Sequence, residues 1–82
     1  MTVTVRLFAD LVEYLPPGAT GKRAQVELPD GANVLALIDH LKIPFEISEG
    51  IIGIAINDEV SHHEAPLKDG DVVSLFPALA GG

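Results

Sequence analysis

The sequence predicts a two-layer α+β domain, in which a β-sheet packs against one main helix. Alternating or β-branched segments indicate four or five strands. One segment between them carries apolar residues at the spacing of a helix face. The chain has 82 residues, which fits a single domain with one core. The expected order is β, short α, β, α, β, β, β, and one main helix against such a sheet gives two layers.

The first part of the chain contains two predicted strands around a short helical segment. Residues 2–7 alternate polar with apolar side chains, as a strand does. Residues 8–15 instead have apolar side chains at i, i+3, i+4 and i+7, and Asp10 with Glu13 resembles a capping box. Residues 23–28 alternate again. The side chains expected on the buried faces of these segments are Val3, Val5, Leu7, Leu11, Val12, Leu15, Ala24, Val26 and Leu28.

The middle of the chain carries the main helix and a strongly apolar strand. Asn33 can cap a helix whose apolar positions fall at helical spacing over residues 34–41, and Pro44 is expected to stop it. Residues 51–56 form a nearly continuous β-branched run, which favours a buried central strand.

The last part of the chain alternates turns with strands. We expect a turn at 57–59, a short edge strand around 60–63 and a second turn at 68–71. The final strand covers 72–76, and Pro77 ends it because proline has no N–H for the ladder.

Composition excludes several classes of function. The chain has 5 basic and 12 acidic residues, a formal net charge of −7, so neither nucleic acid nor an anionic membrane surface is an expected partner. A basic protein surface is compatible with this charge. Without cysteine there is no disulfide, thiolate nucleophile or cysteine zinc site. No signal peptide is visible and the longest apolar stretch, 51–56, is too short to span a bilayer, so we expect a cytoplasmic protein.

Two short motifs carry little functional weight. Residues 18–22 resemble a phosphate loop only in being glycine-rich, because Arg23 stands where Ser or Thr would bind magnesium. His62 and His63 are adjacent, so on an extended chain they point to opposite faces, and His40 lies on the helix. We expect these histidines to be polar surface residues. No metal site, no bound cofactor and no side-chain catalysis are predicted.

The C-terminal segment is the strongest functional signal. After Pro77 the chain continues as 78–82 and ends in Gly81 and Gly82, whose missing Cβ atoms would let a thin, extended backbone enter a narrow channel. The terminal carboxylate is ionised at neutral pH. It can attack the α-phosphate of ATP and become an acyl adenylate. We therefore predict a folded domain over 1–77 and a flexible tail over 78–82 whose end is the reactive group.

Strand parity predicts an apolar surface at the base of this tail. Val73 and Leu75 share the face expected to be buried, which places Phe76 on the opposite face. Phe8 follows the first strand with the same outward parity. Its helical spacing alternatively assigns it to a small core.

The sequence resembles the ubiquitin-like sulfur carriers, in particular the small subunits of molybdopterin synthase, over essentially its whole length. The resemblance is carried by Val5-Arg6-Leu7-Phe8-Ala9, by Ile56-Asn57-Asp58-Glu59, by Pro66 to Val73, and by the tail from Phe76-Pro77 to Ala80-Gly81-Gly82. Each segment alone is short, but their order and spacing are specific.

This resemblance implies a β-grasp fold, a mixed sheet of four or five strands on one main helix. It also implies a reaction cycle in which a ubiquitin-activating-type adenylyltransferase spends ATP to adenylate Gly82, and a sulfur donor then makes the thiocarboxylate. The large subunit of molybdopterin synthase would receive the tail, with the chain acting as a protein co-substrate. The positions implied to contact these partners are Leu79, Ala80, Gly81, Phe8, Val60 and Phe76.

Other assignments remain open. The short first helix reads Leu11-Val12-Glu13, where the family often has arginine, and Pro77 is followed by Ala78 rather than a second proline. Carriers for thiazole, cysteine or other thio-metabolites share the chemistry, although thiazole carriers join their first strands by a tight hairpin and here residues 9–22 intervene. A ubiquitin-like modifier conjugated through its diglycine, or an interaction module with an inert tail, are the alternatives from other classes.

Overall fold

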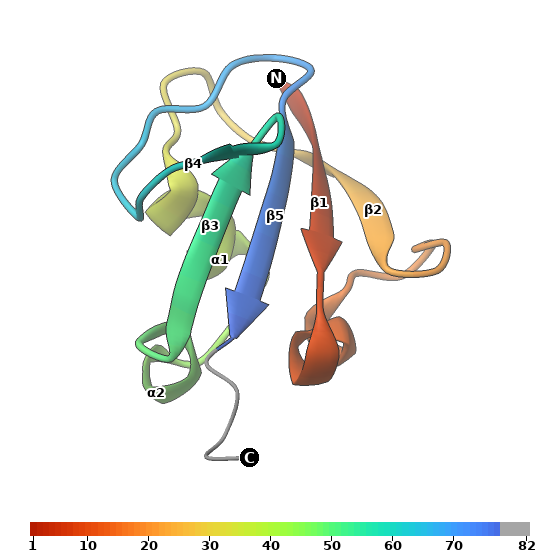
Figure 1. Ribbon diagram of the computed structural model, residues 1–82. Helices are drawn as coiled ribbons and strands as arrows, with labels where there is room; N and C mark the ends of the chain where they lie inside the picture. Colours follow the sequence, from red (N-terminus) through yellow and green to blue (C-terminus); the bar gives the residue numbers. More distant parts are fainter. Residues whose placement is uncertain (78–82) are drawn as a thin grey trace.

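The computed structural model describes residues 1–77, except the side chains of Phe45, Ser48 and Ile52, so the predicted tail 78–82 lies outside the described residues. Five strands, two short α-helices and one 3₁₀ helix make up this part of the chain (Figure 1). In order they are β1 (Thr2–Leu7), η1 (Ala9–Tyr14), β2 (Arg23–Glu27), α1 (Val34–His40), α2 (Phe45–Ser48), β3 (Ile51–Ile56), β4 (Glu59–Val60) and β5 (Val72–Pro77).

The strands form one mixed sheet in the order β2-β1-β5-β3-β4. β1 and β5 are parallel, while the other pairs are antiparallel. The predicted α+β architecture with a mixed five-stranded β-grasp sheet is confirmed. One expectation within it is wrong: β3 is not the central strand, because β5 occupies the middle of the sheet and β3 lies between it and the two-residue β4.

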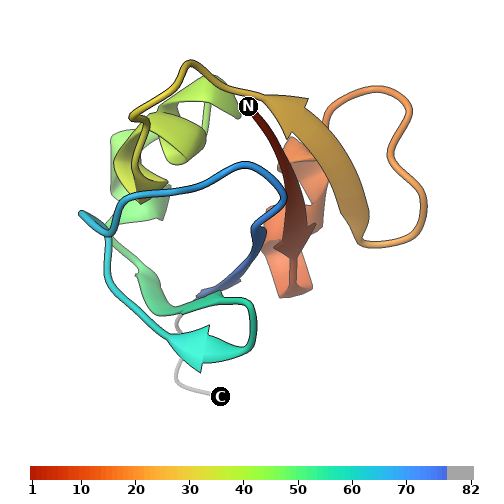
Figure 2. The ribbon, with the colours of Figure 1, turned by 90° about the horizontal axis from the view of Figure 1, so that it is seen from above.

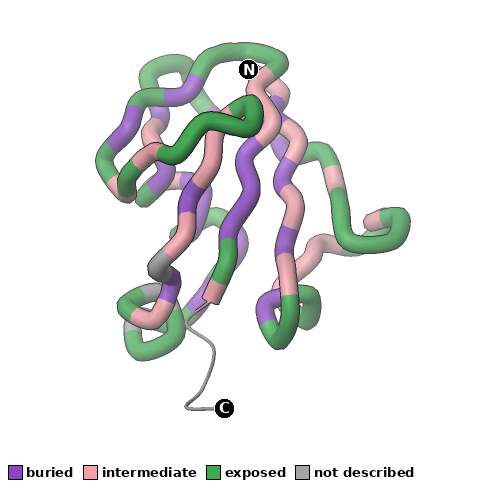
Figure 3. The backbone as a smooth tube through the Cα atoms, in the orientation of Figure 1, coloured by how far each residue is buried: buried purple, intermediate pink, exposed green. Residues whose placement is uncertain are grey.

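The core lies between the sheet and α1, which covers one face of it (Figures 1 and 2). Alternation along the strands sends every second side chain to this face, and Figure 3 shows the alternating buried positions along β1. In the central strand β5 three consecutive residues, 73–75, are buried. Helix α1 begins where predicted, since the Asn33 side chain accepts a hydrogen bond of 2.9 Å from the Ala36 N–H. The largest fully buried side chains are Leu7, Leu11, Leu37, Ile51, Leu75, Val3, Val5, Val34 and Val73.

Two helical segments differ from the sequence-based expectation. The segment after β1 is a 3₁₀ helix, and no side chain caps it, so Asp10 and Glu13 do not form a capping box. With three residues per turn the predicted α-helical face is not kept: Leu11 is buried, whereas Val12 is 38% exposed. Helix α1 ends at His40, and Lys42 has a positive φ of 60°, so the helix stops before it reaches Pro44. Pro44 instead directly precedes α2, because proline is well tolerated at the start of a helix.

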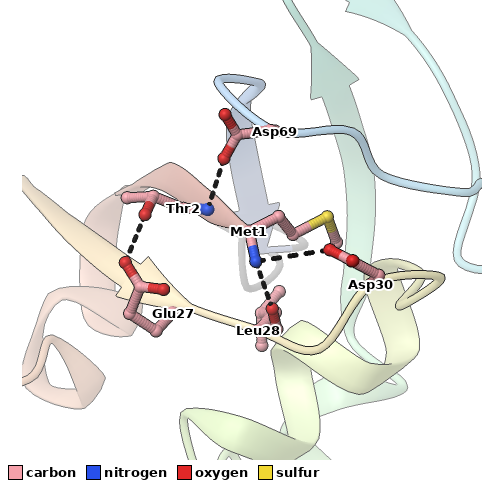
Figure 4. A network of polar contacts seen from close by, with 6 residues as sticks. All are labelled: Met1, Thr2, Glu27, Leu28, Asp30 and Asp69. Atoms are coloured by element: carbon pink, nitrogen blue, oxygen red, sulfur yellow. Dashed lines mark hydrogen bonds and ion pairs between the residues drawn. The ribbon is translucent and has the colours of Figure 1, made fainter.

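The end of the sheet farthest from Pro77 is held by polar contacts around the first two residues (Figure 4). The Met1 ammonium donates a hydrogen bond of 2.7 Å to the Leu28 carbonyl, and the Thr2 N–H donates one of 2.7 Å to the Asp69 carboxylate. The Thr2 hydroxyl also contacts the Glu27 carboxylate. These bonds connect the start of β1 with the end of β2, the residue after it and the loop before β5. They thereby help to fix the register of β1 between these two strands. None of the helices in residues 1–77 has the length and apolar character needed to cross a membrane.

Candidate functional site

The candidate site surrounds Pro77, the residue at which β5 ends. Pro77 pairs with Ile51 at the start of β3, so it lies at the end of the sheet where β5 finishes and β3 begins. The parallel strand β1 also finishes at this end of the sheet, because parallel strands point the same way. The predicted reactive residue Gly82, and Leu79, Ala80 and Gly81 before it, lie outside the described residues, and their roles stay predictions.

Two aromatic rings meet on the outer face of the sheet beside Pro77. Phe8 and Phe76 stack with ring centroids 4.4 Å apart and an interplanar angle of 14°. Phe76 is 39% exposed, and Phe8 is half-buried without belonging to the core. The outward alternative for Phe8 is therefore the one the structure adopts. Stacked rings that remain accessible form a rigid apolar surface that suits a protein contact.

Gly53 of β3 makes room for this stack. It is the register partner of Phe76. A Cβ atom at this position would lie 3.0 Å from the Phe76 Cβ and 3.2 Å from its Cδ2, closer than carbon atoms pack. Glycine here thus allows the Phe76 ring to lie over the neighbouring strand.

Val60 lies on the same outer face but apart from the two rings. It is the register partner of Ala55, which lies two residues after Gly53 along β3 and so on the same face, but farther from Pro77. Its side chain is 95% exposed. The structure therefore brings Phe8 and Phe76 into contact and leaves Val60 as a separate apolar point. Their proposed role as partner contacts stays a prediction.

Two basic side chains lie over the Phe8 ring. The Arg6 guanidinium carbon lies 5.2 Å from the ring centroid and the Lys22 ammonium 5.8 Å from it. Both distances fall within the range of a cation–π interaction. Sequence analysis did not single out these residues. Arg6 on β1 precedes Phe8 by two positions, and Phe8 directly follows the strand in extended backbone, so strand parity could have placed them together. The position of Lys22 depends on how the loop before β2 folds.

An acidic cleft of about 390 Å³ also includes Pro77 in its lining. Its polar lining comes from Asp10, Glu13 and Tyr14 of η1 and from Glu46 of α2. Burial raises the pKa of the Tyr14 phenol, and the Glu13 and Glu46 carboxylates raise it further. The phenol therefore remains a neutral hydrogen-bond donor at physiological pH. The cleft could not be predicted because one of its walls is α2, which has no sequence signal beyond Pro44.

The histidines do not converge. His40 is in the last turn of α1, while His62 and His63 lie in the loop after β4. Within residues 1–77 no three His, Cys, Asp or Glu side chains are arranged to hold a metal ion. The described residues around Pro77 thus comprise an aromatic stack, two cations over the Phe8 ring and an acidic cleft.

Solved structures with the same fold cover nearly the whole chain. Subunit 1 of the molybdopterin-converting factor from Helicobacter pylori, solved in complex with subunit 2, is 29% identical with a TM-score of 0.60, and each chain is fully covered. CysO in the BexX/CysO complex of Amycolatopsis orientalis is 32% identical with a TM-score of 0.61, covering 98% of this chain and 99% of that one.

A third similar structure is small archaeal modifier protein 1 of Haloferax volcanii. It is 25% identical with a TM-score of 0.70, covering 95% of this chain and 98% of that chain. No curated protein sequence matches significantly. The ThiS family model matches residues 5–82, which includes both the sheet and the terminal diglycine. On this evidence the chain belongs to the ThiS family, within the ubiquitin-like sulfur carriers that its sequence resembles.

Proposed function

We propose that this chain carries sulfur on its C-terminus for the synthesis of molybdopterin. A carboxylate oxygen of Gly82 attacks the α-phosphorus of ATP, pyrophosphate leaves, and a sulfur donor then displaces AMP to give the thiocarboxylate. The large subunit of molybdopterin synthase accepts the tail, and the sulfur passes to the pterin precursor held there. The chain acts as a co-substrate in the cytoplasm, where ATP and the activating adenylyltransferase are present.

The observation that carries this proposal is the match to the ThiS family through residue 82, together with a diglycine end on a β-grasp domain. A carboxylate without side chains on its last two residues suits a narrow active-site channel. The molybdopterin pathway is supported by the Helicobacter pylori relative, which is seen bound to subunit 2 of the molybdopterin-converting factor.

A sulfur carrier for a different acceptor is the second candidate. The Amycolatopsis orientalis relative CysO is seen with another partner, BexX. This supports a role in cysteine or other thio-metabolite synthesis through the same chemistry at Gly82. The Haloferax volcanii relative is named a modifier, which supports conjugation of the diglycine to other proteins as the alternative outcome.

Adenylation is tested by ATP–pyrophosphate exchange with the activating enzyme encoded in the same genome. Deleting Gly82, or appending residues after it, is expected to abolish exchange because the carboxylate is then missing or misplaced. Gly81→Val should impair it, since a β-branched side chain widens and stiffens the approach. Thermal unfolding of each variant is the control, and all should unfold as the parent does. Full exchange by the chain lacking Gly82 would overturn the proposal.

The pathway is tested with the thiocarboxylated chain. Intact mass from native cells should show sulfur in place of one terminal oxygen. Adding this form to the large subunit and the pterin precursor should yield molybdopterin, whereas the carboxylate form should not. Sulfur transfer to another acceptor instead would favour the second candidate, and an isopeptide bond from Gly82 to lysines of other proteins would favour the modifier.

A further inference from the structure

Three of the five basic residues of this acidic chain gather at one corner of the sheet. Arg6 and Arg23 are register partners on the adjacent strands β1 and β2, and Lys22 immediately precedes Arg23. The Leu7 N–H donates a hydrogen bond of 3.0 Å to the Lys22 carbonyl, which fixes Lys22 beside the end of β1. We call these three residues the basic corner.

The basic corner is unfavourable for the isolated chain. Like charges directly opposite each other on neighbouring strands repel. The chain has 12 acidic residues, yet among the described side chains no carboxylate lies within 4.0 Å of these three cations. The ion pair found in the described part of the chain lies elsewhere and joins the Met1 ammonium to Asp30. Uncompensated cations are therefore held together in a molecule with abundant negative charge.

Local structure keeps these cations in place. Thr20 and Arg23 exchange backbone hydrogen bonds of 3.0 and 3.2 Å, closing a tight turn in which Gly21 has φ +64°. Arg6 and Lys22 lie over the Phe8 ring at the distances given above. Arg23 also lines a hollow of about 410 Å³ together with Thr4, Thr20 and Gln25. The corner is thus a preorganised extension of the aromatic stack, with room for an incoming side chain next to Arg23.

We propose that the basic corner docks a carboxylate-bearing protein surface of the adenylating enzyme, next to the apolar contact made by Phe8 and Phe76. Aspartate and glutamate match the corner because guanidinium groups bind carboxylates in a two-pronged geometry. The remainder of the chain is strongly acidic and would repel an acidic enzyme surface. The corner therefore favours the orientation in which the enzyme surface faces Arg6, Lys22 and Arg23. The inference rests on the proposed function for the identity of the partner.

The experiment compares two double variants with the same change in net charge. Lys22→Gln with Arg23→Gln removes two cations from the corner, and Lys42→Gln with Lys68→Gln removes the two cations outside it. Each variant is titrated against the adenylating enzyme by calorimetry at low salt, and ATP–pyrophosphate exchange is measured in parallel. Thermal unfolding confirms that both variants fold.

We expect the corner variant to bind about three- to tenfold more weakly than the parent, as the loss of two exposed ion pairs implies. The control should remain within about twofold, since its cations lie away from the docking surface. The difference between the two variants should shrink at about 1 M NaCl, where the Debye length is about 3 Å. Exchange should show the same change in KM with kcat retained, because the corner docks the enzyme and does not touch the reacting atoms.

The outcomes separate this inference from the proposed function. If the parent supports exchange and both variants bind the enzyme as tightly as the parent does, the corner is overturned as a docking site and the carrier function stands. Corner-dependent binding without exchange would support the corner and overturn adenylation. Equal weakening by the control would mean that net charge alone matters, and absence of binding by the parent would overturn the corner as an interface for this enzyme.

Discussion

A single polar side chain, that of Asn57, joins three segments of the sheet. Asn57 and Asp58 form the two-residue loop between β3 and β4, and both have positive φ, 53° and 68°, as a type I′ hairpin turn requires. The Asn57 side chain also accepts a hydrogen bond of 3.0 Å from the Val72 N–H and donates one of 2.9 Å to the Asp71 carboxylate. Part of the sequence motif shared with the family thus has a structural role.

Replacing Asn57 separates the two parts of this role. Asn57→Gly keeps a residue that tolerates positive φ and loses only the side-chain bonds, so we expect a loss of about 1 kcal/mol in unfolding free energy. Asn57→Ala also replaces a residue that tolerates the left-handed region with one that does not, and about 2 kcal/mol should be lost. Urea unfolding measures both. Equal losses would show that the backbone conformation does not matter at this position.

At the scale of elements, local pattern predicted most of the sheet and little of the site. β1 and β3 have the predicted bounds, and β2 and β5 differ by one residue at an end, because alternation and β-branched runs are local properties. The central place of β5 was not predictable, since β3 has an equally apolar sequence and pairing between distant strands leaves no local trace. The contact of Lys22 with the Phe8 ring likewise depends on a loop whose path follows from tertiary packing.

The contact between β3 and β5 at Gly53 gives a prediction for these two elements. Gly53→Ala should lower the unfolding free energy by about 1–3 kcal/mol, because its Cβ would lie 3.0 Å from the Phe76 Cβ and the Phe76 side chain would have to move by a few tenths of an ångström. In a Phe76→Ala background the loss caused by Gly53→Ala should fall by about half. The ring atoms of residue 76 are then gone, while its Cβ remains close to the new Cβ at residue 53. A double-mutant cycle by denaturant unfolding measures this coupling. Strict additivity would show that the ring does not rest on Gly53.

At the scale of the whole molecule, the proposed function divides recognition and chemistry between two parts of the chain. Within residues 1–77, the core, the aromatic stack and the basic corner are all formed by residues before Pro77. The predicted reactive carboxylate belongs to residue 82. Under the proposed function, the folded domain recognises the enzyme without supplying a reacting group, and the C-terminal carboxylate reacts.

This division predicts that a chain ending at Pro77 is a competitive inhibitor. It should fold with a free energy of unfolding within about 0.5 kcal/mol of the parent, because terminal residues beyond the core contribute little. It cannot be adenylated. It should nevertheless inhibit ATP–pyrophosphate exchange by the full chain competitively, with a Ki within about tenfold of the parent's KM, if the centrally packed rings supply most of the binding energy. The same truncation carrying Phe76→Ala is the matched control and should inhibit weakly. If the truncated chain folds but does not inhibit, the enzyme recognises the tail itself, and the outer face of the sheet has no part in docking.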